Sequence, residues 1–254
     1  TLWHSSAASD VYKRQHLPLA LVGGFLLGAI WGAIAGYLKI ARGLNEVLTT
    51  LLLNYIAQNF VNYMVSEPLI APEAPSPYTP LIAESARLPI ILPKTQAHAG
   101  ILLGLAIAII LAVAFSLTAF GYQVDAVGQN PTAASYAGIS VNQTIFLVMG
   151  LSGGLAGLAG STEVLGAKYR LFENFSPGYG FDAIAIALLS RGNPLAVILT
   201  SLFFGLLRSG ANIMQRSTGV SITIVYAIQG LTMLFLAISL GFESRTGKGH
   251  PTNL

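Results

Sequence analysis

The 254-residue sequence contains no cysteine and few charged residues. Without cysteine, the chain can form no disulfide, no thiolate nucleophile and no cysteine-based metal site. Charged residues make up 9% of the sequence and hydrophobic residues 54%, whereas about a quarter of the residues in an ordinary soluble domain are charged. This composition excludes an ordinary soluble domain and indicates helices that are apolar on all sides, as in a membrane.

Motifs of common enzymes and nucleotide-binding proteins are also absent. The sequence has no Walker-type glycine loop and no HExxH pair, and its four histidines are dispersed. Its net charge of +3 comes from lysines and arginines scattered between apolar runs, so nucleic acid is not an implied partner. We therefore expect no catalytic residue, no metal site and no cofactor. If the chain takes part in ATP-driven work, another chain must bind the ATP.

Five long charge-free runs predict membrane-spanning helices, because each is close to the ~20 residues that cross ~30 Å of hydrocarbon. They are residues 17–38, 47–65, 100–120, 144–162 and 220–242. Two shorter runs, 183–190 and 194–207, are interrupted at Arg191, Gly192, Asn193 and Pro194 and predict two short helices joined by a tight turn. Broken segments of this kind tend to line transport pathways. The predicted fold is an all-α, polytopic transmembrane bundle of about seven helical segments.

The connections between the predicted helices differ in character. Residues 66–97 hold seven of the twelve prolines, which predicts a stiff extended loop. Alternation of the spans places this loop on the same side of the membrane as residues 168–180 and 208–219. The loop 120–143 then lies on the opposite side, with residues 39–45. Lysine and arginine are almost equally divided between the two sides, so their distribution does not orient the chain.

Small residues fill one predicted span and the loop before it. The segment 150–161, GLSGGLAGLAGS, predicts a helix that packs closely on a neighbour. The loop 120–143 predicts a turn at residues 129–131 and then a short helix closed by Gly138. We expect Ala133, Ala134 and Ala137 to form a flat surface suited to docking in a partner's groove, although a simple connector is the alternative.

Polar residues within the predicted spans are the candidate pathway residues, because burying them in lipid is costly. On the second segment these are Asn45, Glu46, Asn54 and Gln58, together with Asn59 and Asn62. The spacing of four between Asn54, Gln58 and Asn62 predicts a single polar row. Uncharged amides suit a neutral, hydroxyl-bearing solute, although they can also bond only to neighbouring helices.

Three further polar residues lie in or beside the later spans. Gln229 in the last span has the same two interpretations as the amide row, pathway-lining or structural. Glu163 and Asp182 border the loop after the fourth span, where we expect them to be solvated at the membrane interface.

Four sequence blocks resemble the nucleoside and simple-sugar branch of bacterial ABC importer permeases. They are GLNEVLTTLLLNYIAQNF, AVGQNPTAASYAGIS, GFDAIAIALLSRGNPLAVIL and SITIVYAIQGLTMLF, and they occur in the family's order. The resemblance covers roughly residues 17–240 and extends to the wider branched-chain amino acid and ribose-type permease superfamily. It implies a multi-pass protein of the bacterial plasma (inner) membrane that forms the pathway for nucleosides or simple sugars.

The resemblance also implies partners and an orientation. The expected partners are an ABC ATPase subunit, a second permease subunit and an extracytoplasmic substrate-binding lipoprotein, all assembled at the lipid bilayer. The proline-rich loop and residues 175–179 would face outside. The cytoplasmic coupling segment that contacts the ATPase would comprise Gly128, Asn130, Ala133, Ala134, Gly138 and Ile139. Two departures stand out: Asp125 occupies a position that is commonly basic in the family, and further N-terminal helices are missing.

The resemblance divides the chain into three regions. Residues 16–242 are the predicted transmembrane permease domain, and residues 243–254 are a predicted cytoplasmic tail. Residues 1–15 are polar and aperiodic, which indicates a non-native, adaptor-derived or disordered segment; the alternative is a short cytoplasmic tail before the first span.

Three alternative functions are open. One is a branched-chain amino acid ABC permease, which would need partners for a carboxylate and an ammonium group. Another is an ion-coupled secondary carrier, which would usually place an acidic residue in the middle of a span, where the sequence shows none. The third is a purely structural membrane subunit.

Overall fold

The computed structural model describes residues 2–72, 75–93, 95–176 and 178–219, together with residues 223, 224, 227, 230, 231 and 235. Over these residues the fold is helical, and its β-structure is limited to two isolated bridges. The predicted span 220–242 is described only at single positions, and Gln229 and the tail 243–254 lie outside the described residues. The chain forms two compact units: unit 1 comprises Thr1–Ile107 and Val113–Phe175, and unit 2 comprises Ala108–Ala112 and Ser176–Leu254.

The structure confirms four of the predicted spans as helices: 17–38, 47–65, 100–120 and 144–162. The elements of unit 1 are α1 (Leu2–Arg42), α2 (Glu46–Ser66), η1 (Glu84–Ala86), α4 (Ala119–Gln129), α5 (Pro131–Tyr136), α6 (Val141–Glu163) and the π-helix η2 (Val164–Lys168). Both ends of α3 (Gly100–Leu117) also belong to unit 1, whereas its residues Ala108–Ala112 belong to unit 2. Helix α1 begins at Leu2, so it includes most of the segment 1–15 that the sequence sets apart. Unit 2 contains α7 (Tyr179–Leu189) and α8 (Pro194–Thr218).

In the part of the chain that the structure describes, four helices are long and apolar enough to cross a membrane. These spans are Gln15–Arg42, Gly100–Leu117, Val141–Lys168 and Pro194–Ser217. The chain is therefore an all-α membrane protein, as its composition predicts. Helix α2 is as long as a span but carries the polar amides, and α7, with 11 residues, is too short to cross the hydrocarbon.

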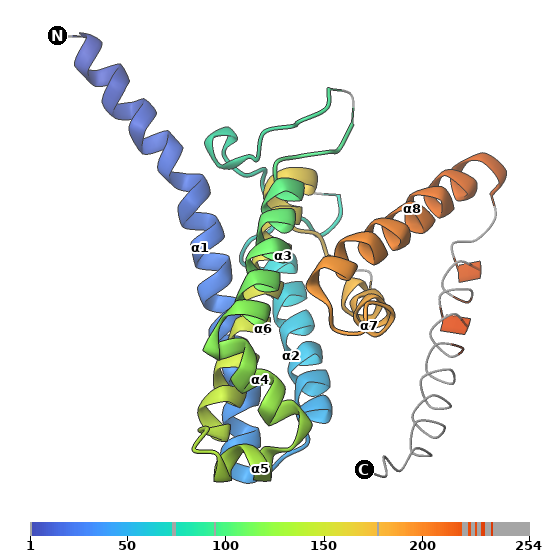
Figure 1. The fold of residues 1–254 in the computed structure, drawn as a ribbon. Coiled ribbons are helices and arrows are strands. Elements are labelled where there is room, and N and C mark those ends of the chain that lie inside the picture. Colours follow the sequence, from blue (N-terminus) through green and yellow to red (C-terminus); the bar gives the residue numbers. More distant parts are fainter. Residues whose placement is uncertain are drawn as a thin grey trace. The chain divides into compact units, whose positions relative to one another are not determined.

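Rows of glycine hold α1 and α6 together in unit 1, where the two helices lie alongside each other (Figure 1). A Cβ atom added to Gly28 would lie 2.9 Å from the Cα of Gly157, and one added to Gly32 would lie 2.9 Å from the Cα of Gly153. Only glycine permits two backbones to approach this closely. This contact confirms the prediction that the small face of 150–161 packs tightly. Its partner is a row in α1 at a spacing of four: Gly24, Gly28, Gly32 and Gly36.

The two loops predicted to share one side of the membrane contact each other in unit 1. Thr79 N donates to Leu171 O at 3.1 Å, and Ile82 N donates to Tyr169 O at 2.9 Å. Arg170 lies over the ring of Tyr78, 4.7 Å from its centroid. The proline-rich loop is extended apart from η1, as predicted, and the loop after η2 pins it in place.

The prediction that residues 120–143 form one loop is wrong at its start. After α3 ends, Thr118 leaves the helical conformation and its Oγ accepts a hydrogen bond from Gly121 N at 3.4 Å, which caps a new helix, α4. Gly121 and Val127 are buried, so α4 packs within unit 1. The glycine and polar residues of this segment are typical of a loop, but a cap and one buried face stabilise a helix there.

Unit 2 confirms the predicted turn but not the predicted lengths of its helices. Arg191 and Gly192 have left-handed φ values of 50° and 74°, which reverse the chain, and Asn193 then caps α8 ahead of Pro194. Helix α8 continues for 25 residues to Thr218, so the predicted short helix 194–207 is wrong, as is the predicted loop 208–219. The charge of Arg208 suggested an end to the helix, but its side chain is neutralised by an ion pair with Asp182.

We expect Gly28→Ala to destabilise the protein by about 1–3 kcal/mol, because the added Cβ forces α1 and α6 apart. Gly23→Ala is the matched control, since a Cβ at Gly23 meets nothing within 4 Å. The control should be neutral or more stable by up to about 1 kcal/mol, owing to the higher helix propensity of alanine. Thermal unfolding in detergent measures both, and equal melting temperatures for the two variants would contradict the glycine contact.

Candidate functional site

Asn45 and Glu46 lie at the turn between α1 and α2. Asn45 Oδ1 accepts hydrogen bonds from Val47 N at 2.9 Å and Leu48 N at 3.4 Å, so its side chain is the N-cap of α2. The amide that the sequence suggests as a pathway residue therefore satisfies the first backbone donors of a helix.

Glu46 forms an ion pair with Lys39 across this turn, with Oε1 and Nζ 2.7 Å apart. The hydrogen bond from the Lys39 ammonium holds the pKa of the Glu46 carboxyl below its ordinary value. Both side chains are partly exposed, at 32% for Lys39 and 43% for Glu46, so solvent screens the attraction. The pair links the end of α1 to the start of α2.

The predicted amide row follows one face of α2, but its members differ in their contacts. Asn62 is bonded to the loop after η2: its Oδ1 accepts from Asn174 N at 2.9 Å and its Nδ2 donates to Asn174 Oδ1 at 3.3 Å. Asn59, which is outside the row on another face of α2, donates to Tyr55 O of its own helix at 2.8 Å. Asn54 is exposed and Gln58 half-buried, and neither side chain has a hydrogen-bond partner in the described part of the chain. These two amides remain available to a solute or a partner helix.

The short helix α5 has both ends fixed by hydrogen bonds. Asn130 Oδ1 accepts from Ala133 N at 3.0 Å, and Pro131 occupies the first helical position. At the other end, Ile139 N donates to Ala134 O and Gly138 N to Ser135 O, both at 3.0 Å, while Gly138 has a φ of 82°. This arrangement is a Schellman motif. The predicted turn, short helix and closing glycine are all confirmed. Gly128, near the end of α4, is exposed.

The prediction that Ala134 belongs to the flat outer surface of α5 is wrong. Ala134 is 3% exposed and faces the interior of unit 1, whereas Ala133 and Ala137 are exposed. Tyr136, which the sequence analysis did not single out, is 88% exposed and protrudes from the same short helix. The outward surface of α5 is therefore two alanines beside one aromatic ring.

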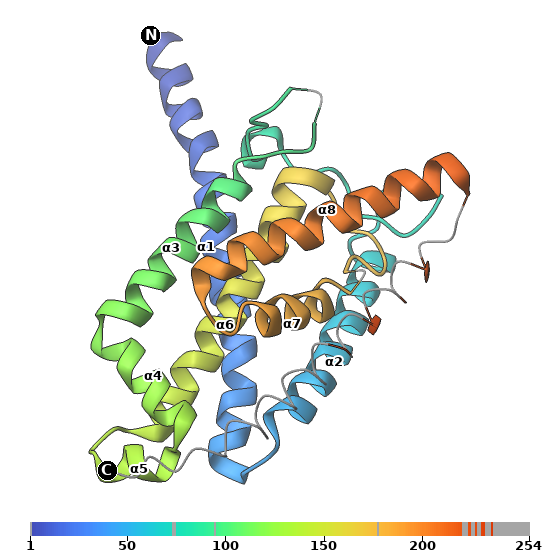
Figure 2. The ribbon, with the colours of Figure 1, turned by 45° about the vertical axis from the view of Figure 1, so that its right-hand side comes forward.

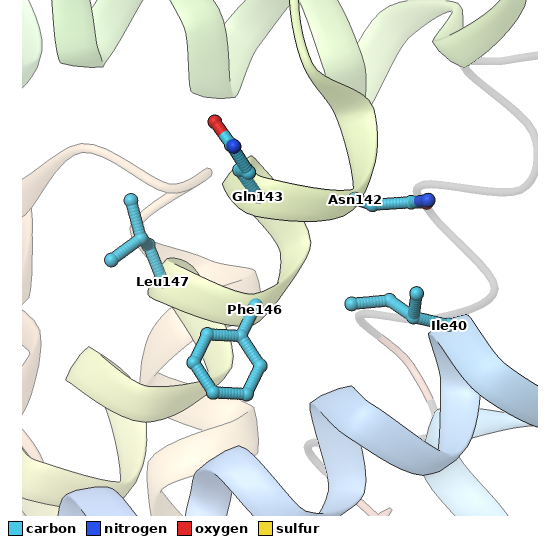
Figure 3. A pocket seen from close by; sticks show the side chains of 5 residues that line it. All are labelled: Ile40, Asn142, Gln143, Phe146 and Leu147. Carbon is cyan, nitrogen blue, oxygen red and sulfur yellow. The ribbon is translucent and has the colours of Figure 1, made fainter.

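A pocket of about 420 Å³ lies near the start of α6 (Figure 3). Ile40 of α1 faces Asn142, Gln143, Phe146 and Leu147 of α6 across it. Gln143 Oε1 accepts a hydrogen bond from Ser140 Oγ at 2.7 Å, next to the end of α5. The pocket places residues 39–45 and the segment before α6 at the same end of unit 1, as predicted, but none of the predicted pathway residues lines it.

A charged cluster joins α7 to α8 in unit 2. Asp182 Oδ2 and Arg208 Nη1 lie 2.5 Å apart, with side-chain exposures of 17% for Asp182 and 18% for Arg208. The Arg208 guanidinium also lies over the ring of Tyr179, 4.3 Å from its centroid. The expectation that Asp182 is solvated is therefore wrong. The sequence signal was present, since an acid and a base each border an apolar run, but their contact requires the chain reversal at residues 190–193.

Arg208 lies near the middle of the candidate span Pro194–Ser217. Its side chain forms an ion pair with the carboxylate of Asp182 in α7. An unpaired charge near the middle of a membrane helix costs about 2.5–3.5 kcal/mol even on the scale of membrane-insertion experiments, which gives the lowest values. The ion pair with Asp182 therefore favours insertion of α8 into the membrane.

Comparison with known proteins gives one family for nearly the whole chain. Residues 3–237 match the family described as branched-chain amino acid transport system / permease component. The glucose ABC transporter permease protein TsgB13 of Haloferax volcanii is 34% identical over 237 residues, which cover 89% of this chain and 62% of that protein.

Guanosine or nucleoside appears in the descriptions of further relatives. The guanosine ABC transporter permease protein NupP of Bacillus subtilis is 36% identical over 92% of this chain and 68% of its own length. The nucleoside ABC transporter permease protein NupB of Lactococcus lactis is 29% identical over 96% of this chain and 69% of its own length. The chain thus spans about two thirds of the length of these relatives, 62% to 69%. No solved structure matches the chain significantly.

The Lys39–Glu46 pair predicts a pH-dependent contribution to stability. Because the pKa of Glu46 is lowered in the folded protein, this contribution is present above the ordinary value of 4.5 and is lost as the pH falls through the lowered pKa. We expect Glu46→Gln to cost about 0.2–1 kcal/mol at pH 7 and progressively less as the pH falls below 4.5. Melting temperatures of both proteins across this range test the prediction, and a difference that grows toward low pH would refute it.

Proposed function

The chain belongs to the family of branched-chain amino acid transport system permease components, and from that premise we propose that it is the membrane-spanning permease subunit of an ATP-driven importer for neutral nucleosides or simple sugars. The observation that carries the proposal is the family match over residues 3–237, joined to relatives described as guanosine, nucleoside and glucose ABC transporter permeases. The protein supplies a pathway and performs no covalent chemistry.

The polar groups of the chain support a neutral solute over an amino acid. Asn54 and Gln58 offer amides that can both donate to and accept from hydroxyl groups. The cation near the middle of α8, Arg208, is already matched by Asp182. A zwitterionic amino acid needs one charged partner for its carboxylate and another for its ammonium group. Because Arg208 and Asp182 pair with each other, their charges offset one another and do not serve these two groups. The branched-chain amino acid alternative is therefore less well supported.

The ion-coupled carrier alternative would require an acid that gains and loses its coupling ion during transport. Asp182 forms an ion pair with Arg208 of α8, so its carboxylate already has a partner within the protein. This contact argues against Asp182 as the site of a coupling ion. Membership of the permease family further supports an energy source on a separate chain.

We assign the coupling role to the segment from Gly128 to Ile139. Its proposed outer surface includes Tyr136 and leaves out the buried Ala134. Exposed Ala133, Ala137 and Tyr136 would meet the ATPase subunit, while Asn130, Ala134 and Gly138 keep α5 in shape. This end of unit 1 would face the cytoplasm, and the proline-rich loop would face the extracytoplasmic substrate-binding lipoprotein. A second permease subunit would complete the pathway in the bacterial inner membrane.

The coupling assignment predicts that Ala133→Arg reduces two quantities at least ~10-fold: co-purification with the ATPase and solute-stimulated ATP hydrolysis. The reason is that an extra charge buried without a partner at an interface costs more than about 1.4 kcal/mol. Ala133 is exposed, so insertion and melting temperature should not change. Gln123→Arg, at an exposed position of α4, is the control for added charge. Wild-type ATP hydrolysis in Ala133→Arg would remove the assignment.

The pathway assignment predicts that Asn54→Leu lowers ATP-dependent uptake of labelled uridine or glucose into proteoliposomes about 10-fold, because one solute hydrogen bond is lost. Asn59→Leu is the matched control on another face of α2, where the amide already bonds to Tyr55 O. Its uptake should fall less than about twofold. Equal losses in the two variants, or loss of ATPase assembly by Asn54→Leu, would indicate that the amide is structural.

A further inference from the structure

The pocket near the start of α6 lies at the ends of two candidate membrane spans (Figure 3). These spans, Gln15–Arg42 and Val141–Lys168, have 28 residues each. A helix of this length covers about 42 Å, which is close to the ~40–45 Å of a bilayer with its headgroup layers. Ile40 is two residues before the end of the first span, and Asn142 is the second residue of the other. This end of the pocket therefore lies at the depth of the lipid headgroups.

The lining of the pocket changes from polar to apolar along α6. Asn142 and Gln143, in the first turn of this helix, each carry an amide, whereas Phe146 and Leu147 lie one turn further into the span. One turn advances about 5.4 Å, so the two apolar side chains lie near the level where the headgroup layer meets the hydrocarbon. Phe146 is 43% exposed and Leu147 is 53% exposed. The pocket thus presents hydrogen-bonding groups at headgroup depth and uncovered apolar surface one turn deeper.

A positive charge ends α1 beside the pocket. Arg42, the last residue of α1, is exposed, and its guanidinium has no ion pair or hydrogen bond in the described part of the chain. The other two charges of this turn, Lys39 and Glu46, pair with each other, so Arg42 leaves the turn with one net positive charge. Guanidinium groups bind phosphates by directed hydrogen bonds, and basic pockets between membrane helices bind anionic headgroups.

We propose that this pocket binds an anionic phospholipid of the surrounding leaflet, such as phosphatidylglycerol. The phosphate contacts Arg42 and the amides of Asn142 and Gln143. The upper part of one acyl chain packs on Ile40 and Phe146, and the rest of the lipid stays in the bilayer. A soluble anion would leave the apolar lining uncovered, and a purely apolar molecule would leave Arg42 unpaired, whereas an anionic lipid satisfies both. The proposal goes beyond the proposed function, because it does not depend on which solute the protein carries.

Photo-cross-linking of the protein in phosphatidylcholine vesicles tests which molecule occupies the pocket. The probe is a small fraction of phosphatidylglycerol with a diazirine in its acyl chain, and mass spectrometry locates the cross-linked residues. We expect cross-links at the pocket residues of α1 and α6, which excess unlabelled phosphatidylglycerol should remove. Glycerol 3-phosphate should not compete, and phosphatidylcholine with the same diazirine should label the pocket much less. Competition by glycerol 3-phosphate, equal labelling by the two lipids, or no labelling of the pocket because a protein segment covers it would overturn the proposal.

Two variants separate the headgroup contact from the acyl-chain contact. Arg42→Gln should weaken binding of phosphatidylglycerol about fivefold, the effect of one arginine at a membrane surface, and Arg170→Gln, at the opposite end of unit 1, is its control. Leu147→Trp should lose most of the pocket cross-links, because the larger ring fills the cavity. Its control is Leu151→Trp, since Leu151 is exposed one turn further along α6 and does not line the pocket. Unchanged labelling in either test variant would overturn the proposal, and the exposed position of Arg42 keeps the test valid if Leu147→Trp does not fold.

Discussion

The close contact of α1 with α6 is the constraint on which the rest of unit 1 depends. In lipid, two helices gain little from hiding apolar surface from each other, so their association relies on close backbone approach and van der Waals contact. The glycines of α1 and α6 permit that approach along several turns. With the two helices locked together, Ile40 lies opposite Phe146 at one end, and η2 pins the proline-rich loop at the other. The glycine rows thus fix the relation between the two ends of the unit.

The elements that follow from hydrophobicity alone could be predicted from the sequence, because lipid imposes one simple requirement on a long apolar run. The helical parts of α1, α2, α3 and α6 are of this kind. So are the turn and the short helix at residues 129–138, where asparagine, proline and glycine occupy positions with defined backbone geometry. The small face of α6 could also be predicted, but not its partner, since the choice of neighbour is a tertiary property.

The sequence predictions that the structure contradicts have one cause: each role was inferred from the type of a residue, without knowledge of its contacts. Arg208 suggested the end of a helix because an unpaired charge does not enter lipid, yet Asp182 pairs with it and α8 continues. Ala134 suggested part of a docking surface because it is small, yet small size also suits it to a buried position. In each case a partner distant in sequence, or the direction of one side chain, decides between two physically sensible roles.

The rigidity of α5 bears on how the proposed coupling could work. A six-residue helix has too few internal hydrogen bonds to hold its shape alone, and here an asparagine cap and a Schellman motif fix both ends. Between them, buried Ala134 attaches the helix to unit 1. In the proposed coupling, a force applied at the exposed Tyr136 would displace α5 as one body and pass to α6, which begins three residues after Gly138. Because glycine contacts join α6 to α1, such a force would move these two helices together.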